Sequence, residues 1–178
     1  MENFAVGATE QLVIKALKEA NEDVNKKAAL LKELVDEVVG DKLDLLDSMI
    51  HNVSVMLSNE KELTNQDLNR IILQLPLYVY ELSDFIQKLE IRISIAEASQ
   101  NEDEANATLT TEGTVATKQA RSRKAGLKNY LIYSAYKGAL TMVKNKMNTA
   151  LELLAGAKKV QSSRMAEMQL SSYSKSVE

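Results

Sequence analysis

Apolar residues recur at alternating steps of three and four along four stretches of this chain. One clear series is Leu43, Leu46, Ile50, Val53 and Leu57. Such steps place side chains on one face of an α-helix, so each series predicts a helix that packs lengthwise against another helix. Six Gly and one Pro among 178 residues leave little to interrupt these helices. The sequence therefore predicts an all-α fold, either a helical bundle or a set of coiled-coil-like helices.

The series and the gaps between them predict the organisation of the chain. An acidic region at 1–98 holds three helices (about 10–39, 42–58 and 65–98), and a mobile acidic loop (99–113), a long basic helix (114–170) and a disordered tail (171–178) follow. The loop is inferred from polar residues without any period. The last helix would be roughly 80 Å long at 1.5 Å per residue. We expect so long a helix to bend, to break near a glycine (Gly126, Gly138 or Gly156), or to extend into another subunit.

Several residues predict where the first three helices begin and end. Gly40 should end the first helix, because glycine adopts the left-handed conformation at low cost. Asp41 should cap the second helix, and Thr64 with Asp67 predicts a capping box at the start of the third. Pro76 removes a backbone donor inside the third helix, which predicts a kink or a short break there.

Charge is segregated along the chain. The first 112 residues carry 10 Lys and Arg against 22 Asp and Glu, and the rest carry 12 against 3. No acidic residue lies between Glu112 and Glu152. Charge distributed in this way calls for a partner of opposite sign. The basic half either neutralises the acidic helices, within one chain or between subunits, or binds a polyanion.

The basic helix carries its cations in two rows. Arg123, Tyr130, Lys137 and Lys144 follow one another at steps of seven and form a stripe that includes one aromatic ring. Lys118, Arg121, Lys124 and Lys128 cluster on one face of the first turns. Cations that follow a nucleic-acid backbone, with a ring on which bases stack, are typical of sequence-tolerant single-strand binding. The alternative is a solvated face that also attracts the acidic helices.

An apolar series on the same helix predicts self-association. Its members are Tyr133, Tyr136, Leu140, Val143, Met147, Ala150 and Leu154. Lengthwise apolar series on an overlong helix leave surface that only another chain can bury. We therefore expect a homo-oligomer in which this series forms the seam between subunits.

Composition argues against catalysis. The chain has no Cys, and its single histidine, His51, lies among apolar residues of a short amphipathic helix. Asp41, Asp44 and Asp47 share a helical face, but carboxylates on one helix are more often solvated than metal-binding. No phosphate-binding loop or nucleophile elbow is present. We expect no enzyme activity, no catalytic residues, no cofactor and no metal.

The same composition gives no sign of a membrane or of secretion. The chain has no apolar run of the roughly 20 residues that a membrane span needs, and no secretory signal at its start. We expect a cytoplasmic protein, in the host cytoplasm if the chain comes from a phage, without membrane contact.

Residues 135 to 169, AYKGALTMVKNKMNTALELLAGAKKVQSSRMAEMQ, resemble the C-terminal helices of bacteriophage recombination mediators of the UvsY type, with KQARSRKAGLKNY as the preceding basic stretch. The similarity covers about a third of the chain and follows a general pattern. It implies a ring-forming helical protein that binds single-stranded DNA and helps to load a recombinase. Lys124 and Lys128 would then be DNA contacts.

These observations lead to one expected function and one alternative. The first is a non-catalytic, oligomeric helical protein that binds a macromolecule, in its most specific form single-stranded DNA, as a recombination accessory. The alternative is a structural or regulatory protein, such as a phage assembly protein or an inhibitor of a host protein, that acts through protein–protein contacts.

Overall fold

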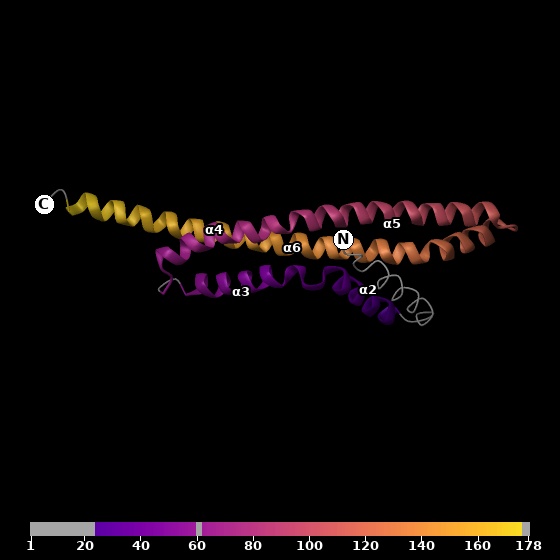
Figure 1. Cartoon of the computed structure of the whole chain (residues 1–178), viewed down its shortest axis with the longest axis horizontal. Coiled ribbons are helices and arrows are strands. Elements are labelled where there is room, and N and C mark those ends of the chain that lie inside the picture. Colours follow the sequence, from indigo (N-terminus) through magenta and orange to yellow (C-terminus); the bar gives the residue numbers. More distant parts are fainter. Residues whose placement is uncertain (1–23, 60–61, 176–178) are drawn as a thin grey trace, which may run out of the picture. The chain divides into compact units, whose positions relative to one another are not determined.

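The computed structural model describes residues 24–59 and 62–175, and every element in that part of the chain is helical (Figure 1). The elements are α2 (Val24–Val39), the 3-10 turn η1 (Gly40–Leu43), α3 (Asp44–Ser58), α4 (Asn65–Glu81), α5 (Ser83–Thr110) and α6 (Val115–Lys175). The predicted all-α class is confirmed. Residues 10–23 of the predicted first helix lie outside the described residues. None of the described helices is long and apolar enough to cross a membrane.

The chain divides into two compact units that share α6. The first unit contains α2, α5 and α6 as far as Met142, and the second contains α3, α4 and α6 from Val143 onwards. The helices predicted within the acidic region 1–98 therefore contribute to both units.

In the first unit, α2 and α5 both pack against the N-terminal part of α6. Leu34 of α2 and Ala135 of α6 are buried at the centre of the α2 contact, surrounded by partly buried leucine and isoleucine side chains. Helix α6 runs back along α5 after a short turn at 111–114 (Figure 1). On this side the Ser122 hydroxyl donates to the Glu104 carbonyl at 3.0 Å. Burial of apolar side chains between α2 and α6 stabilises the unit.

In the second unit, α3 and α4 form a helical pair against the C-terminal part of α6. Val53 of α3 and Leu68 and Leu75 of α4 are fully buried. The Gln161 amide donates to Asn69 Oδ1 at 2.6 Å, which joins α6 to the start of α4. The predicted capping box is confirmed: the Asp67 backbone N–H donates to Thr64 Oγ1, and the Thr64 N–H donates to the Asp67 carboxylate.

The start of α3 differs from the prediction. Gly40 ends α2 with a φ of 52°, as expected, but a 3-10 turn follows it and α3 begins only at Asp44. The N-cap is Leu43, without a side-chain capping bond, so the prediction that Asp41 caps this helix is wrong. Leu43 is 4% exposed, so this turn places one apolar side chain in the core.

The predicted helix at 65–98 is two helices, and the break is not at its proline. Helix α4 continues through Pro76 and ends at Glu81. A proline removes one backbone donor, and the neighbouring bonds hold the helix together. The break lies at Leu82, whose N–H bonds to the Val79 and Tyr80 carbonyls, and the Ser83 hydroxyl donates to the Tyr80 carbonyl. These bonds satisfy the end of α4 before α5 begins.

The predicted acidic loop at 99–113 is also wrong, because α5 is helical as far as Thr110. Glu, Gln and Ala favour helices, and a solvated helix needs no apolar period. The non-helical turn is confined to 111–114, where Gly113 has a φ of 125° that glycine adopts readily.

Helix α6 runs without a break for 61 residues. It passes through Gly126, Gly138 and Gly156, so the expected break at a glycine is absent. It also continues through Ser171 to Lys175, which corrects the predicted disordered tail for the described part of 171–178.

Candidate nucleic-acid interface

The predicted binding residues all lie on α6. They are Lys118, Arg121, Arg123, Lys124, Lys128, Tyr130, Lys137 and Lys144. Arg121, Arg123 and Lys124 are exposed, whereas Lys118 and Lys128 are half-buried. The three exposed cations are close in sequence and lie near the N-terminal end of α6.

The cations of the first unit face two different ways. An α-helix turns by about 100° per residue, so Arg123, Tyr130 and Lys137 fall along one line that drifts only about 20° per step. We call these three residues the Arg123 stripe. Lys118, Arg121, Lys124 and Lys128, which we call the Arg121 row, lie on roughly the opposite side of the helix. A single strand that runs straight along α6 can therefore follow one set at a time.

Helix α5 occupies the side of α6 between the two sets. Ser122 and Asn129 face it, and Asn129 Nδ2 donates to the Asp103 carboxylate at 2.7 Å. Gly126 lies against Glu104, since a Cβ on this glycine would lie 2.6 Å from the Glu104 carboxylate. The acidic end of α5 thus lies beside the basic end of α6.

Amide side chains bond two of the carboxylates at this end of α5. The Asp103 carboxylate is bonded by the Asn129 amide, and the Glu104 carboxylate accepts from the Gln100 amide at 2.9 Å. Both partners are uncharged. Within the described residues, no salt bridge joins Arg121, Arg123 or Lys124 to a carboxylate. The prediction that acidic helices neutralise the basic helix is therefore not supported, in this unit, for the three exposed cations.

The aromatic rings of this helix differ in access. Tyr130 is 49% exposed, so its ring is available to a stacking partner. Tyr136 is 6% exposed and lies against the Arg92 guanidinium, 5.7 Å from the ring centroid. Tyr133 is half-buried and accepts a hydrogen bond from Lys137 Nζ at 2.9 Å. This bond raises the pKa of the Lys137 amine above its ordinary value.

In the second unit, the cations of α6 are differently placed. Lys144 is exposed and has a partner of its own. Lys146 forms a salt bridge with Asp47 of α3 at 2.8 Å. Pairing between an acidic helix and the basic helix therefore occurs at Lys146, which the sequence analysis did not single out.

The predicted oligomer seam is covered to a large extent within one chain. Tyr136, Val143, Ala150 and Leu154 are buried, and the other members, Tyr133, Leu140 and Met147, are half-buried. The expectation that only a second chain could bury this series is wrong for its four buried members. An exposed apolar surface that the sequence did not indicate lies on α4. Leu73, Leu77 and Tyr80 are exposed there, although they also follow steps of four and three.

The residues weighed for catalysis or metal binding are not gathered into a site. His51 is exposed on α3. Asp47 pairs with Lys146, and among the described residues there is no group of three or more metal-ligating side chains.

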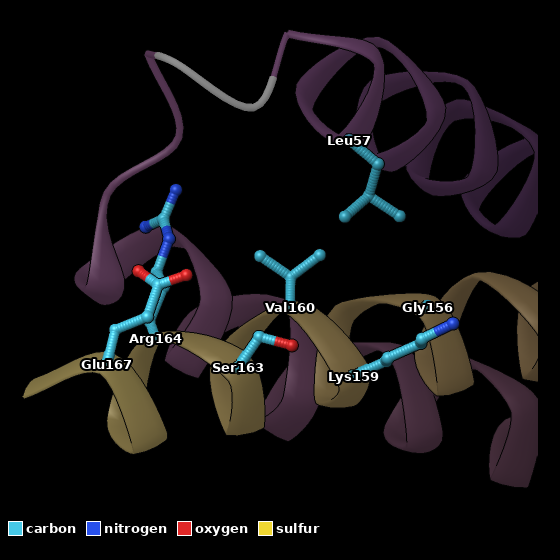
Figure 2. Close-up of a pocket in the computed structure, with 7 residues that line it drawn as sticks. All are labelled: Leu57, Gly156, Lys159, Val160, Ser163, Arg164 and Glu167. Atoms are coloured by element: carbon cyan, nitrogen blue, oxygen red, sulfur yellow. The ribbon is translucent and has the colours of Figure 1, made fainter. Parts of the chain in front are cut away.

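A cavity of about 580 Å³ opens in the second unit between the end of α3 and α6 (Figure 2). Leu57 and Val160 approach it from opposite sides, and Arg164 and Glu167 lie at one end. Arg164 Nη1 donates to the Leu63 carbonyl at 2.6 Å. This guanidinium ties the α3–α4 connection to α6, and the cavity lining combines the Lys159 and Arg164 cations with the Glu167 carboxylate.

No protein-family model, no curated protein and no solved structure matches this chain. Its function is therefore argued from the geometry of its own residues.

Proposed function

We propose that the chain is a non-catalytic binding protein that holds single-stranded nucleic acid on the N-terminal part of α6. One observation supports this proposal above all others. Arg121, Arg123 and Lys124 are exposed on a segment without acidic residues and have no described carboxylate as a salt-bridge partner. Unneutralised cations on a rigid helix attract phosphates, and their counterions are released on binding.

The Arg123 stripe is the part of this surface suited to a single strand. Arg123 and Lys137 would contact phosphates on either side of Tyr130, whose exposed ring offers a face for base stacking. Such contacts read charge and aromatic surface, so binding would be tolerant of sequence. The Arg121 row adds positive potential from the opposite side of the helix and speeds encounter.

The resemblance of residues 135 to 169 to phage recombination mediators gives the proposal its most specific form. The chain would then hold single-stranded DNA for a recombinase, as an accessory in recombination.

The first experiment measures fluorescence anisotropy of a labelled oligothymidine with the full chain at about 50 mM salt and at increasing salt. Lys137→Gln, in the Arg123 stripe, should weaken binding similarly for every sequence and lower the salt slope by roughly 0.7 if one phosphate contact is lost. Lys88→Gln is the matched control, because Lys88 is also exposed but lies on the acidic helix α5. Equal effects of the two substitutions would show a response to net charge alone.

A second pair of variants tests the stacking role of Tyr130. Tyr130→Ala should weaken binding by roughly 1–3 kcal/mol with little change in salt slope, because stacking is not ionic. Tyr130→Phe keeps the ring and should bind nearly as the unaltered chain does. An unaltered chain that fails to bind DNA and RNA at about 50 mM salt, where electrostatic binding is strong, would refute the nucleic-acid proposal.

The second candidate function is a structural or regulatory protein that acts through protein contacts. The observation in its favour is the exposed apolar face of α4, with Leu73, Leu77 and Tyr80. Apolar contacts respond weakly to salt, so a protein partner bound equally well at low and high salt would favour this alternative.

A further inference from the structure

The outer face of α4 is unusually apolar for a helix that is already packed on its inner face. Leu73, Leu77 and Tyr80 are 70%, 61% and 75% exposed. Leu68 and Leu75, on the inner side of the helix, are fully buried. Steps of four and then three bring the three exposed residues onto one line, as in the seam of a two-helix coiled coil. We call these three residues the α4 stripe.

Opposite charges flank the two ends of the α4 stripe. Arg70 precedes it by one helical step and Glu81 follows directly after Tyr80. Both side chains are exposed. The Arg70 Nε donates to Gln74 Oε1 at 3.0 Å, and within the described part of the chain neither Arg70 nor Glu81 takes part in a salt bridge. A stripe with a cation at its start and an anion at its end is complementary to its own reversed copy.

We propose that the α4 stripe binds the α4 stripe of a second copy of this chain, with the two helices antiparallel about a two-fold axis. In this register Leu73 packs against Leu77 of the partner subunit, and Arg70 lies beside Tyr80 and Glu81 of the partner subunit. A two-fold interface makes each of these contacts twice. Two leucine layers form the middle of the interface. At each end, an arginine of one subunit lies beside an aromatic ring and a carboxylate of the other.

Charge decides the direction of the helices. A parallel pair in register would place Arg70 opposite Arg70 and Glu81 opposite Glu81, so like charges would meet at both ends. The antiparallel pair replaces both repulsions with attractions, and it also sets the two helix dipoles in opposite directions.

The length of α4 limits the strength of the dimer. Its 17 residues extend over about 25 Å. A contact between two such helices falls in the small class of protein interfaces, below roughly 1,200 Å², whose members associate reversibly. The dimer should therefore form and dissociate with concentration. It makes no use of the Arg123 stripe, so it stands or falls independently of nucleic-acid binding.

Sedimentation velocity of the full chain without nucleic acid, from micromolar to several hundred micromolar, tests the proposal. The unaltered chain should shift from monomer to dimer. Arg70→Glu and Glu81→Arg should each weaken dimerisation on the order of tenfold, because each creates two like-charge pairs. An equimolar mixture of the two variants should dimerise again, since a heterodimer restores opposite charges at both ends. The double variant should also recover.

Because Arg70 and Glu81 are exposed, neither substitution should disturb folding, which far-ultraviolet circular dichroism verifies. The chain has no Cys, so introduced cysteines report direction without interference. Leu73→Cys mixed with Leu77→Cys should give a disulfide-linked heterodimer, because these positions face each other in the antiparallel register. A monomer at every concentration, no recovery in the mixture, or Leu73→Cys that links only to itself would each overturn the proposal.

Discussion

Replacement of two glycines of α6 by alanine should have opposite effects on stability. Gly138 and Gly156 both lie inside α6, where alanine is favoured over glycine by about 1 kcal/mol. Their surroundings differ. A Cβ at Gly156 would lie 3.8 Å from Leu57 Cδ1, an ordinary contact. A Cβ at Gly138 would lie 2.8 Å from Val35 Cγ2, which is closer than carbon atoms pack.

The two magnitudes follow from these distances. Gly156→Ala should stabilise the chain by about 1 kcal/mol, which corresponds to roughly 2–4 °C in Tm for a protein of this size. Gly138→Ala gains the same helix propensity but overpacks the contact between α2 and α6, at a cost of about 1–3 kcal/mol. Val35 is β-branched and rotates little about χ1, so the clash is not relieved locally. The net effect should lie between about zero and 2 kcal/mol of destabilisation.

Urea unfolding followed by circular dichroism measures both effects in one assay. A double-mutant cycle then tests the cause, because Val35→Ala removes the methyl group that clashes. Val35→Ala should cost less stability in the Gly138→Ala background than alone, by roughly 0.5–3 kcal/mol. If Gly138→Ala stabilises as much as Gly156→Ala does, or if the cycle shows no coupling, α2 does not pack against α6 at Val35.

Three further predictions concern α4. Thr64→Ala should destabilise the chain by about 0.5–2 kcal/mol in thermal or urea unfolding, because the capping bond is lost. The Thr64 side-chain and backbone hydrogen bonds lower the pKa of Asp67. The stability that the Asp67 carboxylate contributes is therefore fully present above its ordinary pKa, and it is lost as the pH falls through the lowered pKa. Asp67→Asn should therefore lose stability relative to the unaltered chain at neutral pH and match it in acid, and a difference unchanged by pH would contradict this. Leu75→Ala, at a fully buried position, should cost about 2–5 kcal/mol of stability. Leu73→Ala, at an exposed position of the same helix, should change monomer stability by less than about 0.5 kcal/mol. Equal effects would show that the inner and outer faces of α4 are wrongly assigned.

The sequence by itself was sufficient for the features that depend on neighbouring residues. The all-α class follows from apolar steps of three and four. Gly40 ends α2 because glycine tolerates a φ of 52°, and Thr64 with Asp67 starts α4 because each supplies a bond to the other's backbone. The long basic helix from Val115 could also be predicted, since its cations and apolar residues recur with one helical period.

The candidate site was only partly accessible from the sequence. Spacing alone places Arg123, Tyr130 and Lys137 on one line. It does not show that the Asn129 and Gln100 amides, rather than cations, bond the nearby carboxylates. Nor does it show that Lys146 pairs with Asp47. These bonds join residues far apart in the chain or depend on which side of a helix its neighbour covers.

Tertiary packing also decided which apolar series is buried. The α6 series around Tyr136 and Val143 is covered within one chain, whereas the α4 stripe, with similar steps, faces outward. The last turns of α5 have no apolar period of their own, yet they are helical and lie against α6. Periodicity states that a helix has an apolar face, but only the arrangement of the other helices determines what that face contacts.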